Sequence, residues 1–185
     1  MAIEEPNFTV SLREGACEIR DYQAFVAAEV MVTGDQKVAA SKGFRVLATY
    51  IFGGNTGRQS IAMTAPVTQQ PASETIAMTV PVTQTPTDGA WVVRFTMPSR
   101  YSLETLPQPN DPRITLRAIP AARFVVMRFS GVASIASVAA RTGELIAFAK
   151  ARNLRTTGPA SLAQYNPPWT LWFMRRNEVM IQLEA

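Results

Sequence analysis

The stretch IAMTAPVTQQPASETIAMTVPVTQ, residues 61–84, contains almost the same nine residues twice, as IAMTAPVTQ at 61–69 and IAMTVPVTQ at 76–84. Small and β-branched residues dominate both copies, which favours an extended chain. Pro66 and Pro81 each remove a backbone donor, so neither can lie in the middle of a fully paired strand. The repeat therefore predicts two bulged edge strands joined by a polar turn.

Two interpretations of this repeat remain open. In the first it is an irregular hairpin, and Met63 and Met78 are adaptable side chains that fill the core. In the second the prolines and bulges prevent the sheet from closing, so that an opening forms here.

The chain around the repeat divides into two similar halves. Each half has two strands, a glycine, an amphipathic helix and further strands. Gly34 and Gly131 are separated by the same number of residues as Arg20 and Arg117. One helix cannot cover both faces of its own sheet, so the halves are expected to join their strands and place both helices on one side.

Two helices follow from apolar residues at helical spacing. The first has its apolar side from Ala40 to Ile51 and ends at Gly53, and the second follows Ser134, which suits a helix N-cap. We predict one α+β domain over residues 1–185 with pseudo-twofold symmetry. A cleft where the halves meet is a favoured position for a ligand.

Composition excludes several classes of function. The chain of 185 residues has no histidine and a single cysteine, Cys17, so Ser-His-Asp catalysis, histidine metal sites and internal disulfides are excluded. The net charge of +4 comes from scattered residues, with no basic run that would indicate nucleic-acid binding. No apolar run is long enough to span a membrane, and the first residues do not resemble a secretory signal. We expect a cytoplasmic protein, or a periplasmic one whose leader has been removed.

Four stretches together resemble the SOUL heme-binding protein family in order and spacing. They are YIFGGN at 50–55, the doubled MTAPV/MTVPV, FTMPSRYSLETLPQPNDPRI at 95–114 and YNPPWTLWFMRRNEVMIQL at 165–183. The resemblance runs from about residue 8 to residue 183. It implies a distorted β-barrel of two similar βαβ-containing halves, about 8–98 and 112–183, with two long helices.

The resemblance also implies a function and a site. Members of the family bind heme and other tetrapyrroles in a shallow apolar groove, without catalysis. The groove lies along the first helix and the loop before the last strand. The corresponding positions of this chain are Lys42, Phe44, Arg45, Leu47, Tyr50, Met63, Leu171 and Phe173.

This chain departs from the family at two positions. Some members ligate iron through a histidine, which is absent here, and Leu171 stands where others have a basic residue. Lys42 and Arg45 could pair with the propionates of a tetrapyrrole or could be ordinary solvent-facing charges. Tyr50 could stack on heme or pack into the core.

Three functions therefore compete. The first is a non-catalytic module that binds heme or a related tetrapyrrole. The second is a sensor or carrier of another amphipathic small molecule in the same cleft. The third is an enzyme, but no residue pattern identifies a nucleophile with its base.

Overall fold

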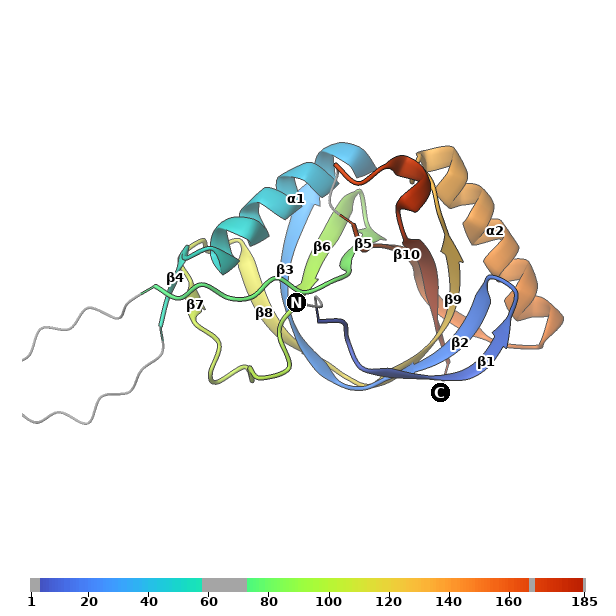
Figure 1. The fold of residues 1–185 in the computed structure, drawn as a ribbon, viewed down its shortest axis with the longest axis horizontal. Helices are drawn as coiled ribbons and strands as arrows, with labels where there is room; N and C mark the ends of the chain where they lie inside the picture. Colours follow the sequence, from blue (N-terminus) through green and yellow to red (C-terminus); the bar gives the residue numbers. More distant parts are fainter. Residues whose placement is uncertain (1–3, 58–72, 167–168, 185) are drawn as a thin grey trace, which may run out of the picture.

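The computed structural model describes residues 4–57, 73–166 and 169–184 (Figure 1). Nine of the strands form one antiparallel sheet that curves strongly across the molecule. In spatial order they are β1 (Phe8–Glu14), β2 (Cys17–Tyr22), β9 (Ala122–Phe129), β11 (Asn177–Leu183), β10 (Thr156–Gln164), β5 (Val82–Thr87), β6 (Ala90–Thr96), β3 (Phe25–Thr33) and β8 (Ile114–Ile119).

Two long helices lie on the outer side of this curve (Figure 1). Asp35 caps α1 (Gln36–Ile51) by accepting a hydrogen bond from the Val38 amide. Ser134 caps α2 (Ile135–Ala151) in the same way, as the sequence predicted. The predicted α+β class with two helices is confirmed. The smaller elements are β4 (Asn55–Thr56), β7 (Gln108–Pro109) and the 3₁₀ turn η1 (Trp172–Met174).

The sheet repeats one arrangement of strands on either side of the neighbouring strands β5 and β10. One arm runs β5, β6, β3, β8, and the other runs β10, β11, β9, β2. In each arm the third strand, β3 or β9, is followed along the chain by a helix. The fourth strand, β8 or β2, comes from the half of the sequence that forms the other arm. The sheet ends at β1 and β8 and does not close, so the fold is an open curved sheet rather than a complete barrel.

Three clusters of apolar residues hold these layers together. α1 packs against β3 and β6, and α2 packs against β9 and β11. The third cluster includes Tyr22, Val126 and Met180 and lies on the face of the sheet that carries no helix. Successive residues of a strand point to opposite faces, which is why Val125 packs under α2 while its neighbour Val126 does not.

The first copy of the repeat, with Met63 and Pro66, lies outside the described residues. In the second copy Pro81 comes just before β5, and β5 pairs with β6 on one side and β10 on the other. The prediction of an edge strand is therefore wrong for this copy. Because Pro81 lies outside the strand, its missing donor does not interrupt the ladder. Met78 is partly buried against the cluster under α1.

Within the described residues, no helix combines the length and the apolar character needed to cross a membrane.

Candidate functional site

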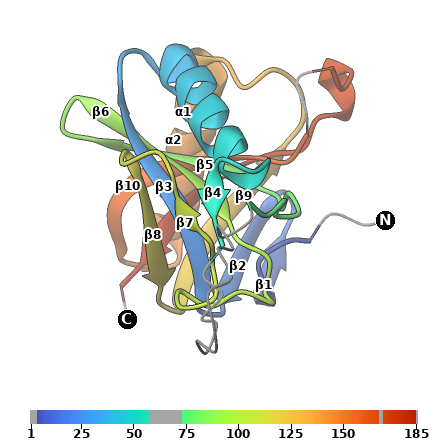
Figure 2. The same cartoon turned by 90° about the vertical axis from the view of Figure 1, so that its left-hand side faces the viewer.

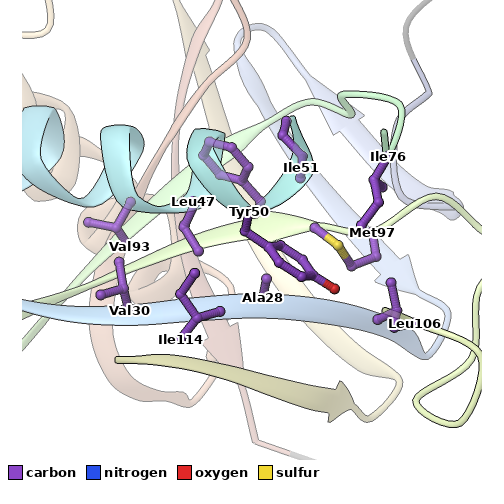
Figure 3. Packing of buried hydrophobic residues seen from close by; sticks show 11 residues of the cluster. Ala28, Val30, Leu47, Tyr50, Ile51, Ile76, Val93, Met97, Leu106 and Ile114 are labelled. Carbon is purple, nitrogen blue, oxygen red and sulfur yellow. The ribbon is translucent and has the colours of Figure 1, made fainter. Parts of the chain in front are cut away.

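The residues predicted along α1 fall into an exposed group and a buried group. Lys42 and Arg45 are exposed. Phe44 is 38% exposed, and its ring lies 5.5 Å from the ring of Phe95. Leu47 and Tyr50 are completely buried between α1 and the sheet (Figure 3).

Tyr50 has a structural partner at the end of the helix. Its hydroxyl donates a hydrogen bond of 2.8 Å to the Pro107 carbonyl. The Asn55 side-chain amide donates to the carbonyls of Tyr50 and Glu74, both at 2.7 Å. This part of the YIFGGN motif therefore ties the end of α1 to two loops, and Tyr50 corresponds to the core-packing alternative.

The predicted residues near the C-terminus lie in another part of the structure. Leu171 and Phe173 are 58% and 55% exposed, and Trp169, Trp172 and Met174 beside them are exposed as well. Trp172 lies close to Gly131, because a Cβ atom built on Gly131 would be 4.0 Å from Cε3 of the Trp172 ring. Figures 1 and 2 accordingly place η1 beside the turn that leads into α2, and apart from α1. The structure does not bring the two predicted parts of the groove together, and Met63 is outside the described residues.

Residues on the other face of the sheet form a pocket, and none of the site residues predicted from the sequence lines it. It measures about 340 Å³ and lies on the helix-free face, where the two arms meet. Tyr22, Phe25, Phe124 and Met180 give it apolar walls. Its volume is at the lower end of the range typical of small-molecule sites.

Polar groups lie on one side of this pocket. Arg94 on β6 stands directly opposite Thr83 on β5, and both line the pocket. Arg94 Nε donates to Glu29 Oε1 at 2.7 Å, and Arg117 Nε lies 3.0 Å from Glu29 Oε2. The Thr83 hydroxyl is buried and has no hydrogen-bond partner among the described residues. The alternation of residues 91–97 could have placed Arg94 on this face, but the pairing of β5 with β10 is not visible in the sequence.

A buried ionic network lies beside the pocket. Glu178 is completely buried and accepts hydrogen bonds from Arg20, Arg176 and Tyr165. Burial alone would raise the pKa of Glu178, but these partners, Arg20 first, lower it below its usual value. Burial and the charge of Glu178 raise the pKa of Tyr165. The complete pairing of Glu178 indicates a structural role.

Candidate ligands for a metal are few. The described residues contain no cluster of three or more Cys, Asp or Glu side chains suited to a metal ion. Cys17 is buried in the cluster under α2, and burial raises the pKa of its thiol. Such a thiol is a poor thiolate ligand.

Comparisons with known proteins agree on the fold. A family model described as "SOUL heme-binding protein" matches residues 3–182. No curated protein sequence matches the chain significantly. Among solved structures, the C-terminal domain of EcmrR has a TM-score of 0.64 at 11% identity, over 91% of this chain and 97% of that one. A hydrolase from Listeria innocua has a TM-score of 0.57 at 14% identity, over 94% of each chain. At such identities the likeness shows a shared fold alone.

Proposed function

The chain belongs to the SOUL heme-binding protein family, and on this premise we propose that it binds a tetrapyrrole such as heme without catalysing a reaction on it. The observation that carries the proposal is the family match over residues 3–182. SOUL proteins are a family of binding proteins, and the absence of histidine removes the usual general base of serine and cysteine hydrolases.

We place the ligand on the exposed side of α1. An α-helix turns by about 100° per residue, so Arg45 lies between Phe44 and Lys42 around this side. Phe52, which follows the helix, is 63% exposed and lies two turns beyond Arg45 on the same side. A flat ring across Phe44 and Phe52 would have Arg45 at its edge, where a guanidinium can pair with a propionate in bidentate fashion. Lys42 is farther around the helix and would contribute less.

The iron of a bound heme would have no histidine ligand. Tyr50 is buried and donates its proton to the Pro107 carbonyl, and Cys17 is buried under α2. Any iron ligand would therefore be water or a weak side-chain donor such as a methionine thioether. Binding would rest on ring contacts and propionate pairing, both of which metal-free protoporphyrin IX also provides.

Titration with hemin and with protoporphyrin IX, followed by absorbance and by quenching of tryptophan fluorescence, tests the proposal. We expect micromolar binding of both, with dissociation constants within about threefold of each other. Arg45→Ala and Phe52→Ala should each weaken binding about tenfold, because each removes one of the two kinds of contact. Arg155→Ala is the matched control, since Arg155 is 86% exposed and lies in the connection between α2 and β10 rather than on α1.

Two results would contradict the proposal. Failure of both porphyrins to bind at micromolar concentration would remove the tetrapyrrole. Unchanged binding in Arg45→Ala and Phe52→Ala would remove the exposed side of α1 as the site.

A second candidate is a carrier or sensor of another amphipathic molecule on the same surface, favoured by the absence of a histidine ligand for iron. Native mass spectrometry of freshly purified protein would distinguish the two, because a co-purifying ligand of another mass would favour the carrier or sensor. Hydrolysis of p-nitrophenyl acetate should not exceed that of the buffer, and turnover would contradict the non-catalytic assignment.

A further inference from the structure

We infer that the pocket on the helix-free face is a separate binding site for a small molecule with an apolar body and one carboxylate. The pocket lies on the opposite face of the sheet from α1, so it does not depend on the surface proposed for the tetrapyrrole. Its walls come from β2, β3, β5, β6, β8, β9, β10 and β11, and therefore from both arms of the sheet.

The side chain best placed to recognise a carboxylate is Arg94. Its Nε and Nη2 both contact Glu29, while its Nη1 has no partner among the described residues. Glu29 also pairs with Arg117, so this cluster of three side chains carries one net positive charge. A carboxylate that reached Nη1 would neutralise this charge in a partly desolvated setting, where charge-assisted hydrogen bonds are strong.

The Thr83 hydroxyl is the second, independent observation. Thr83 and Arg94 are directly paired residues of adjacent antiparallel strands, and both side chains point to the pocket face. A buried hydroxyl without a partner is destabilising, and native structures rarely keep one without a reason. A ligand oxygen held by Arg94 would lie within reach of this hydroxyl after rotation about its side-chain bond. The same ligand would therefore satisfy both unpaired groups.

The rest of the pocket favours an apolar body. Tyr22, Phe25, Phe124, Ile119 and Met180 line it together with four prolines. A volume of about 340 Å³ holds about eleven groups the size of a liquid water molecule, at about 30 Å³ each. This corresponds to roughly nine or ten carbon atoms and a carboxylate, so decanoate is a suitable probe.

Isothermal titration calorimetry with decanoate, decanol and decyltrimethylammonium tests the charge preference. The three probes have saturated chains that differ by one carbon atom at most, and they differ mainly in the charge of the head group. We expect decanoate to bind at least tenfold more tightly than either of the others. Tighter binding of decyltrimethylammonium would show that the negative charge of Glu29, rather than the positive charge of Arg94, determines which head group binds, and would overturn the inference. Equal binding of all three probes would overturn it as well.

Two variants test the residues. Arg94→Leu should weaken decanoate binding at least tenfold, whereas Arg155→Leu, on an exposed side chain outside the pocket, should not change it. Thr83→Val keeps the shape of the side chain and removes the unpaired hydroxyl. It should weaken decanoate binding several-fold without lowering the melting temperature of the free protein. If Arg94→Leu does not fold, Thr83→Val decides, and unchanged affinity there would overturn the role of Thr83.

Competition with hemin separates this site from the tetrapyrrole surface. Protein saturated with hemin should bind decanoate with unchanged affinity, since the two ligands lie on opposite faces of the sheet. Displacement of decanoate by hemin would overturn the assignment of the pocket as a separate site. Because decanoate is titrated first without hemin, failure of the tetrapyrrole proposal would leave this result intact.

Discussion

Arg20 and Glu178 form a buried bidentate ion pair across β9, the strand that separates β2 from β11. Arg20 Nη1 donates to Glu178 Oε2 at 2.8 Å, and Nη2 donates to Oε1 at 3.0 Å. The two residues are 2% and 0% exposed. Tyr165 donates a further hydrogen bond of 2.6 Å to the same carboxylate. This cluster fixes three strands that the chain order alone does not bring together.

Removing the charge of Glu178 should strongly destabilise the fold. Glu178→Gln removes the completely buried partner of Arg20 and leaves only the less buried Glu18, whose Oε2 lies 2.6 Å from Arg20 Nε. Breaking a buried pair costs about 3–5 kcal/mol when the remaining charge is uncompensated, so we expect a loss of about 3 kcal/mol, at the lower end of this range. The free energy of unfolding, measured by urea denaturation and circular dichroism, should fall by that amount. Asp21→Asn breaks the exposed pair of Asp21 with Arg123 and should cost at most about 1 kcal/mol. Equal effects of the two substitutions would contradict the importance given to the buried pair.

The same carboxylate makes stability depend on acid. The pKa of folded Glu178 is lowered from its ordinary value of 4.5, although burial opposes this shift. A lowered folded pKa gives a stabilisation that is complete above pH 4.5 and is lost as pH falls toward the folded value. The melting temperature of the native protein should therefore fall below pH 4.5, and Glu178→Gln should show a shallower fall. Parallel curves for both proteins would assign the acid dependence to other carboxylates.

Helix caps and the alternation of residues along a strand could be predicted from the sequence, because both depend on residues that are close together in the chain. Ser134 can cap a helix wherever that helix packs, and the alternation of apolar and polar residues in β6 follows from strand geometry. The position of β5 inside the sheet depends on pairing with β10, far along the chain, so the prolines alone suggested an edge strand. The open edges of the sheet are likewise set by long-range pairing.

The candidate site was harder to predict for a related reason. On an amphipathic helix, residues that line a groove and residues that pack on a sheet share the same spacing, so Leu47 and Tyr50 could not be assigned to one class. The separation of Leu171 from α1 depends on the path of the chain near Gly131. The pairing of Thr83 with Arg94 requires the register of a hairpin, and its significance requires the neighbouring strands.

Tyr50→Phe separates a role in the core from a role in the site. The substitution removes the hydrogen bond to the Pro107 carbonyl and leaves that buried acceptor unpaired, which costs about 1–3 kcal/mol. The midpoint of urea denaturation should therefore fall. Because Tyr50 is completely buried, the affinity for hemin should stay within about twofold of the native value. A fivefold loss of affinity with unchanged stability would place Tyr50 in contact with the ligand instead.

Gly43 and Gly143 lie near the middle of α1 and α2, and we expect substitution by alanine to change the free energy of unfolding in opposite directions at the two positions. Gly43 faces the sheet, and a Cβ there would lie 2.5 Å from Val93 Cγ2 and 2.6 Å from Val93 Cβ. Gly43→Ala must therefore push α1 away from β6, and overpacking of this kind costs about 1–3 kcal/mol, offset by at most about 1 kcal/mol of helix propensity. Gly143 lies on the exposed side of α2, where a Cβ would meet nothing within 4 Å. Gly143→Ala should accordingly raise the free energy of unfolding by about 0.5–1 kcal/mol. Urea denaturation of both variants measures the contrast, and stabilisation by Gly43→Ala would show that the close packing of α1 on Val93 is wrong.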